Sequence, residues 1–204
     1  MTETDGSTPR RVSLGSDHPV WDRFFQVSPL VVIGTIEESG EIDLAPKHMA
    51  MPMGWDNYFG FMCTPAHATY GNAVRTGEFT VSVPRPSQIV LASLAAAPRC
   101  DDASKPALAL LETIPATRVQ GALLAEASLH LECRLHRVYD DFGEHSLITG
   151  AVVEAHVDEA SIRRSDRDDE QLIFEAPLLA YLNPGRYAPV THSFAFPFHE
   201  GWSR

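Results

Sequence analysis

Residues Ala45 to Asn72 read A-P-K-H-M-A-M-P-M-G-W-D-N-Y-F-G-F-M-C-T-P-A-H-A-T-Y-G-N. The pattern predicts a strand end, a loop rich in Met, Pro and Gly, an apolar strand over Tyr58–Cys63, and a polar turn that opens a helix. Polar residues flank the apolar strand: Lys47 and His48 precede it and Thr64 to Asn72 follow it. Such an arrangement suits a flat, partly apolar ligand with one anionic end.

Outside this stretch the chain offers short apolar strands and amphipathic helices. Strands are predicted over residues 30–36, 42–46, 58–63, 78–83, 128–139 and 146–157, and helices over 66–76 and 88–97. Turns are expected at Ser39–Gly40 and at Asp140–Gly143, and Trp21 to Phe25 predicts a short helix or turn. Residues 99–126 show no clear periodicity. The pattern favours a mainly β fold, an antiparallel barrel with helices packed outside it.

Alternation is clearest between Ser128 and Tyr139. Leu129, Leu131, Cys133 and Leu135 alternate with His130, Glu132, Arg134 and His136. Period two indicates a strand with one buried and one polar face. Cys133 is then a core residue.

Length and charge limit the class of protein. A chain of 204 residues suits one domain, and we expect a flexible leader over residues 1–17 followed by a single domain over 18–204. The formal net charge of −11 argues against a nucleic-acid partner. The sequence contains no apolar run long enough for a membrane helix, and three cysteines without a C-x-x-C motif favour the reducing cytoplasm.

The polar turn permits two interpretations. His67, Thr69 and Asn72 lie at or beside a predicted helix N-terminus, where free N–H groups and the helix dipole favour phosphate. Thr64 and Thr69 add hydroxyl donors. A simple N-cap with surface polar residues explains the same pattern, and spacing alone favours that simpler interpretation.

The loop after Ala45 also permits two interpretations. Met49, Met51 and Met53 offer apolar walls for a flat ring, with an irregular backbone for its edge, or they plug the end of the barrel. Cys63, at the end of the apolar strand, lies where it can line the same site. The nine histidines show no metal-binding spacing, so no metal is expected.

Several motifs in order give the chain a resemblance to a known family, the flavin reductase-like group of FMN-binding split barrels that includes flavoredoxins. The motifs cover roughly residues 29–187. They are P-L-V-V-I-G-T with I-D-L-A-P-K-H-M, H-A-T-Y-G-N-A-V-R-T-G-E-F-T-V-S-V, L-H-L-E-C-R-L with G-E-H-S-L-I-T-G-A-V-V-E-A-H-V-D, and P-L-L-A-Y-L-N-P-G-R-Y.

The resemblance implies a split β-barrel homodimer that binds FMN and uses NAD(P)H as co-substrate. It implies hydride transfer from NAD(P)H to flavin, with a small-molecule acceptor or a monooxygenase component as partner. The implied cofactor-binding residues are Ala45, Pro46, Lys47, His48, Met49, Ala50, Cys63, Thr64, His67, Thr69 and Asn72. No catalytic residue is assigned.

The chain departs from the family pattern at functional positions. Asp43 replaces a frequent Asn, His48 replaces a Ser, and His67-Ala68 replaces the Lys-Asp of a K-D-T motif. A titratable group at position 67 predicts weaker or pH-dependent phosphate binding. Two alternatives therefore stay open: a split barrel that binds flavin, haem or another flat ligand without reductase activity, and a flavin-dependent enzyme acting on an organic substrate.

Overall fold

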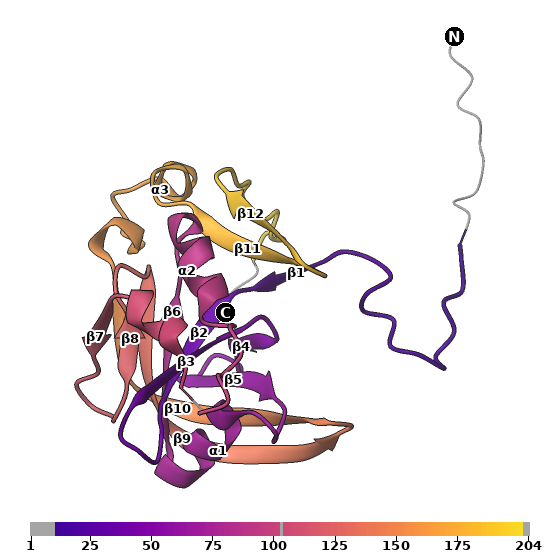
Figure 1. Cartoon of the computed structure of the whole chain (residues 1–204). Helices are drawn as coiled ribbons and strands as arrows, with labels where there is room; N and C mark the ends of the chain where they lie inside the picture. Colours follow the sequence, from indigo (N-terminus) through magenta and orange to yellow (C-terminus); the bar gives the residue numbers. More distant parts are fainter. Residues whose placement is uncertain (1–10, 103, 202–204) are drawn as a thin grey trace.

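The computed structural model describes residues 11–102 and 104–201, which form twelve strands, three α-helices and three 3₁₀ turns (Figure 1). The strands are β1 Gln26–Pro29, β2 Val31–Ile36, β3 Ile42–Lys47, β4 Ala50–Pro52, β5 Tyr58–Cys63, β6 Glu78–Val83, β7 Thr113–Pro115, β8 Ala122–Leu124, β9 Leu129–Phe142, β10 His145–Val157, β11 Leu178–Asn183 and β12 Arg186–Val190. The helices are α1 Ala68–Thr76, α2 Ile89–Leu94 and α3 Asp169–Glu175, and the 3₁₀ turns are η1 Pro86–Gln88, η2 Pro106–Leu110 and η3 Glu159–Ser161. Within this described part, no helix is long and apolar enough to cross a membrane.

The main sheet has seven antiparallel strands in the order β3-β2-β6-β9-β10-β5-β4. Its two edge strands are nearly consecutive in the chain, because only His48 and Met49 separate the end of β3 from the start of β4. A flat sheet of this size would hold its edges about 29 Å apart, at about 4.8 Å per strand. Three residue steps span at most about 11 Å. The sheet therefore curls until its edges approach, and residues 48–49 cross this seam.

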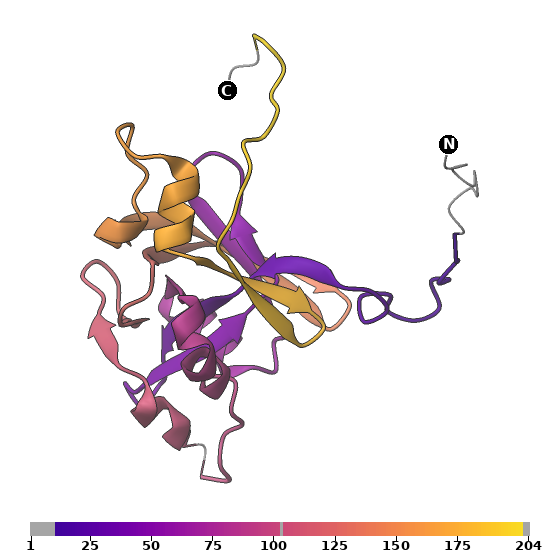
Figure 2. The same cartoon turned by 90° about the horizontal axis from the view of Figure 1, so that it is seen from above.

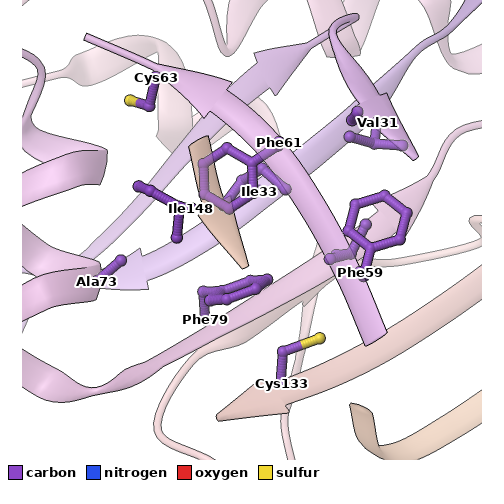
Figure 3. Close-up of a cluster of buried hydrophobic side chains, with 11 residues drawn as sticks. Val31, Ile33, Phe59, Phe61, Cys63, Ala73, Phe79, Cys133 and Ile148 are labelled. Atoms are coloured by element: carbon purple, nitrogen blue, oxygen red, sulfur yellow. The ribbon is translucent and has the colours of Figure 1, made fainter. Parts of the chain in front are cut away.

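Both faces of β2 are buried, which explains its continuous apolar sequence. Val31 and Ile33 face the barrel interior, where Phe61 and Phe79 pack edge to face with ring centroids 5.2 Å apart (Figure 3). Val32 belongs to a second cluster outside the barrel, formed with Leu44 of β3, Ala92 and Ala95 at helix α2, Leu124 of β8 and Leu179 of β11. Helix α2 thus covers the outer face of the β2–β3 pair.

A smaller sheet, β1-β11-β12, lies against the seam. Tyr181 of β11 stacks on His48, with ring centroids 4.8 Å apart, so this sheet closes one side of the seam loop. The β9–β10 hairpin extends beyond the body of the barrel (Figure 1). The segment that follows β12 projects away from the sheets (Figure 2).

The predicted barrel with external helices is confirmed, and the strands over 58–63 and 78–83 agree residue for residue. Helix α1 ends as predicted, with Gly77 in the left-handed conformation at φ 69°. Helix α2 is shorter than expected, because η1 includes Gln88 and the helix ends at Leu94, three residues before the predicted end.

One turn prediction was wrong: the hairpin turn lies at Gly143–Glu144, because β9 continues through Phe142. Residues 21–25 form exposed turns and bends, which agrees with the turn alternative expected for them. Residues 99–126 contain η2, β7 and β8, which carry no long periodic pattern. The expected leader lies partly outside the described residues, and residues 11–17 have no regular structure.

Glu132 corrects the prediction of a polar outer face for β9. Its side chain is fully buried, because the loop 117–119 covers it. The carboxylate accepts hydrogen bonds from the backbone N–H groups of Thr117, Arg118 and Val119 and from the Thr117 hydroxyl. Burial opposes ionisation, but these donors outweigh it and lower the pKa of Glu132.

Candidate functional site

Two adjoining cavities open at the seam. The seam cavity, about 200 Å³, is lined by residues 46–49 at and after the end of β3, by residues 62–64 at and after the end of β5, and by His67 and His145. The α1 cavity, about 520 Å³, lies between β3, the start of helix α1 and the segment after helix α2. Pro46, Lys47 and His67 line both cavities. One elongated ligand can therefore pass from the seam to the start of the helix.

The start of helix α1 has no side-chain cap. His67 occupies the N-cap position with φ −87° and ψ 141°, and its side chain makes no capping hydrogen bond. The first N–H groups of an uncapped helix attract anions. This geometry supports the phosphate interpretation of the turn over the simple side-chain cap.

His67 does not replace a lysine as a fixed cation. Partial burial lowers the pKa of His67, and the nearby positive charge of Lys47 lowers it further. From an ordinary value near 6.5, a downward shift leaves the imidazole mostly neutral at pH 7. Positive charge at the α1 cavity must therefore come from other residues.

The buried carboxylate of Asp43 binds two cationic side chains. Asp43 is 2% exposed, and its Oδ1 accepts hydrogen bonds from Arg99 Nη2 at 2.9 Å and from Lys105 Nζ at 3.4 Å. The Lys105 ammonium also donates to the Leu44 carbonyl at 2.9 Å. The other carboxylate oxygen, Oδ2, accepts from the Thr69 hydroxyl at 3.3 Å. Asp43 thus fixes two cations in the wall of the α1 cavity.

Sequence reasoning missed Arg99 and Lys105. They lie 56 and 62 residues after Asp43 in the chain, in the segment without periodicity. The only signal available was Asp43 itself, an acidic residue in an apolar strand that requires buried partners.

His48, which lines the seam cavity, has a ring nitrogen without a partner within the described residues. His48 Nε2 is buried and makes no hydrogen bond within the described residues. Burial, and then the charge of Lys47, lower the pKa of His48, so the ring is neutral at pH 7 and offers one donor and one acceptor. An orphaned buried nitrogen is costly unless a ligand or water pairs with it.

Cys63 stays a thiol in this setting. Burial raises its pKa, despite the opposing charge of Lys47, and its Sγ lies 3.6 Å from the Thr64 carbonyl as a weak donor. This chemistry supports a wall residue and gives no sign of a nucleophile. Within the described residues, no group of three or more His, Cys, Asp and Glu side chains is placed to hold a metal ion.

Most of the sequence-predicted residues line these cavities. Ala45, Pro46, Lys47, His67 and Thr69 line the α1 cavity, and Pro46, Lys47, His48, Met49, Cys63, Thr64 and His67 line the seam cavity. Ala50 and Asn72 line neither. Ala50 is buried in the barrel core, and the Asn72 amide donates to the Thr35 hydroxyl at 3.3 Å. Contact of these residues with a ligand stays a prediction.

Comparisons with known proteins agree with the architecture. Flavoredoxin of Desulfovibrio vulgaris (Miyazaki F) has a similar fold, with a TM-score of 0.75, 19% sequence identity, and coverage of 95% of this chain and 100% of that chain. An FMN-binding protein from Thermus thermophilus gives a TM-score of 0.73 at 20% identity, covering 91% of this chain and 99% of that one. The flavin reductase component of a bacterial two-component tryptophan halogenase gives 0.62 at 20% identity, with 81% and 91% covered.

The sequence itself matches a family model. Residues 26–190 match the model described as flavin reductase like domain, a span that contains β1 to β12 and both cavities. The match confirms the family and split-barrel fold implied by the motifs, and with them the prediction of a flavin reductase-like oxidoreductase. The curled sheet, the uncapped helix beside the seam and the matched residues lead to one conclusion: the chain belongs to the flavin reductase-like family.

Proposed function

We propose that the protein is an NAD(P)H-dependent flavin oxidoreductase that holds FMN across the seam and α1 cavities. The observation that carries this proposal is the continuity of the two cavities at Lys47 and His67. One end offers the side chains of Met49 and Met62 and the irregular backbone at residues 48–49, together with an imidazole nitrogen that has no partner within the described residues. The other offers an uncapped helix and fixed cations. This polarity fits a ligand with a flat ring and a phosphate.

Different residues would hold the ring and the phosphate of the ligand. Residues 45–49 and Met62 would hold the ring, and His48 Nε2 would gain a partner at its edge. The ammonium of Lys47 would stabilise negative charge that develops on the ring. Lys105, Arg99 and the first N–H groups of helix α1 would hold the phosphate. When bound, the flavin supplies the hydride and electron chemistry, while the protein orients it and limits access of water.

The decisive experiment is a visible spectrum of the purified full chain with FMN, recorded without oxygen before and after NADH or NADPH is added. We expect flavin absorbance that bleaches with at least one nicotinamide. Bound FMN that neither nicotinamide bleaches would contradict the reductase assignment and favour a flavin enzyme that acts on an organic substrate. Failure to bind FMN, with a Soret band on adding haem, would favour a different flat ligand.

We also propose a homodimer, as the resemblance implied. An apolar cavity of about 350 Å³ on the outer face of β5, β9 and β10 is lined by residues that include Tyr58, Tyr139 and Phe142. Phe142 is 55% exposed in the single chain, and exposed apolar patches of this kind mark association surfaces. Light scattering with size-exclusion chromatography is expected to give twice the chain mass, and a monomer would contradict the proposal.

The physiological partner and compartment are further proposals. The similar fold of a halogenase-associated flavin reductase supports transfer of reduced flavin to a partner such as a monooxygenase component. Three free cysteines, of which Cys100 is exposed, support a cytoplasmic location. Coupled turnover with a partner enzyme tests the first proposal, and fractionation of the source cells tests the second.

A further inference from the structure

The segment after β12 has an aromatic residue at every second position. Residues 193–199, which we call the aromatic tail, read S-F-A-F-P-F-H and form neither helix nor strand. Alternate side chains of an extended chain point to the same side. The rings of Phe196 and Phe198 agree with this pattern, because their centroids lie 4.7 Å apart. The alternation therefore places three rings along one edge of the tail.

This aromatic edge is exposed in its own chain. Phe194 is 95% exposed and Phe196 is 71% exposed, and the tail projects away from the sheets (Figure 2). Pro197 has no N–H group and disfavours the helical conformation at Phe196, so it keeps the tail close to an extended form. An extended row of rings loses little conformational entropy on docking and gains from the burial of apolar surface.

The cavity of about 350 Å³ on the outer face of β5, β9 and β10, called the outer cavity here, has matching chemistry. Its lining includes Tyr58, His136, Tyr139 and Phe142. The rings of Tyr58 and His136 meet edge to face, with centroids 4.9 Å apart. Tyr139 and Phe142 are themselves exposed in the single chain. Further rings that enter this cavity would therefore find aromatic edges and faces, the contacts that aromatic side chains prefer.

The area of such a contact is that of a stable interface. The three phenylalanines of the tail leave about 400 Å² in water, at about 200 Å² per side chain. A surface of similar size, the outer cavity with its rim, loses contact with water when it covers them. Two-fold symmetry repeats the contact, which gives about 1,600 Å² in all, the typical value for a specific complex.

We propose that the aromatic tail of one protomer docks in the outer cavity of a second copy, and that the two copies exchange tails about a two-fold axis. Because one chain carries both the projecting rings and the aromatic cavity, a second copy is a sufficient partner, and the two-fold arrangement fills both cavities. The inference rests on the homodimer proposed above and assigns the contact that holds its two protomers together.

Dissociation of the dimer tests the role of the tail. The double variant Phe194→Ser/Phe196→Ser removes two of its rings. The matched control is Phe24→Ser/Phe25→Ser, because these two side chains are also exposed and do not line the outer cavity. We expect the tail variant to raise the dimer dissociation constant about a hundred-fold, about 2.8 kcal/mol, and the control to leave it within about three-fold. Sedimentation velocity of the full-length proteins over a range of concentrations gives the constants, and melting curves verify folding.

Disulfide trapping tests where the tail docks. Phe196→Cys and Phe142→Cys are made as two separate proteins in a Cys100→Ser background, because Cys100 is the native cysteine exposed to solvent. The two proteins are mixed and oxidised, so a disulfide between positions 196 and 142 joins two chains. We expect this disulfide to form, and we expect none between Phe25→Cys and Phe142→Cys, the matched pair.

Four results would overturn the inference. A monomeric unsubstituted protein contradicts the homodimer as well as the tail exchange. A dimer that is not weakened by the tail variant, or that is weakened equally by the control, shows that the tail is not the specific contact. Absence of the 196–142 disulfide in a stable dimer places the tail elsewhere. A disulfide within one chain, when both cysteines are combined in one protein at high dilution, assigns the tail to its own cavity. FMN titration of the same samples tests the proposed function separately.

Discussion

Replacing Asp43 by Asn should lower stability and raise affinity for a phosphate ligand at the same time. The carboxylate of Asp43 is buried and accepts from Arg99, Lys105 and Thr69. Asparagine keeps one acceptor of the same shape but removes the negative charge. The substitution thus separates the structural role of this residue from its electrostatic effect on the α1 cavity.

The loss of stability follows from the two charge-assisted bonds. Each contributes about 1.5–3 kcal/mol, and a neutral amide acceptor restores about 0.5–1.5 kcal/mol. The Lys105 side chain is only 9% exposed, so it cannot recover hydration in place of its partner. We expect Asp43→Asn to lower the free energy of unfolding by about 3 kcal/mol, measured by urea denaturation at pH 7 with an unchanged slope.

The gain in affinity follows from Coulomb's law. One unit charge acting on another at about 8 Å and an effective dielectric constant of about 20 contributes about 2 kcal/mol, and screening reduces this figure. Removing the negative charge should tighten FMN binding roughly ten-fold, a difference of about 1.4 kcal/mol. Riboflavin, which has the same ring without the phosphate, is the control ligand, and its affinity should not change.

Two results would refute the reasoning. Weaker FMN binding in a folded Asp43→Asn protein would show that Asp43 favours binding, because it holds the two cations in position. Its repulsion of the phosphate would then be the smaller effect. An equal gain for FMN and riboflavin would show that the phosphate is not held near Asp43. The titration is done in low and high salt, because the gain must shrink as ionic strength rises.

Three further predictions concern the barrel around the proposed site. A Cβ at Gly150 would lie 2.6 Å from the ring of Phe79, so Gly150→Ala should lower the free energy of unfolding by about 1–3 kcal/mol in denaturant titrations. Glu132→Gln should lower the free energy of unfolding at neutral pH. Because folding lowers the pKa of Glu132, this loss of stability should be complete above the unfolded pKa, about 4.3, and should disappear as pH falls through the folded pKa. Burial raises the pKa of Cys133 to about 12, so at pH 8 a thiol reagent should label only the exposed Cys100 in the native protein.

Each of these has its own control. Gly71→Ala is the matched change for position 150, because a Cβ at Gly71 of helix α1 meets no atom within 4 Å; it should stabilise the helix by up to about 1 kcal/mol. Equal destabilisation by both alanines would contradict the packing argument. A Glu132→Gln deficit that does not vary with pH would contradict the role of the charge. In denaturant all three cysteines should react, and rapid labelling of Cys133 in the native state would show that the barrel opens.

Much of the barrel could be predicted because its signals are local. An apolar run located β5, period-two alternation located β6, and Gly77 marked the end of helix α1 because the left-handed conformation favours glycine. The order of the motifs, together with the stretch from Ala45 to Asn72, was sufficient to predict the flavin reductase-like family.

Tertiary structure decided the features that depend on distant neighbours. Alternation shows that Glu132 and Cys133 face opposite ways, but it does not show that residues 117–119 cover the former. The sequence raised the question of whether His67 supplies the missing cation. The fold answers it by lowering the pKa of His67 and by bringing Arg99 and Lys105 to Asp43. The physical reason is that charge interactions and burial depend on all neighbours in space. Here those neighbours lie in residues 99–126, a segment whose sequence has no periodic pattern.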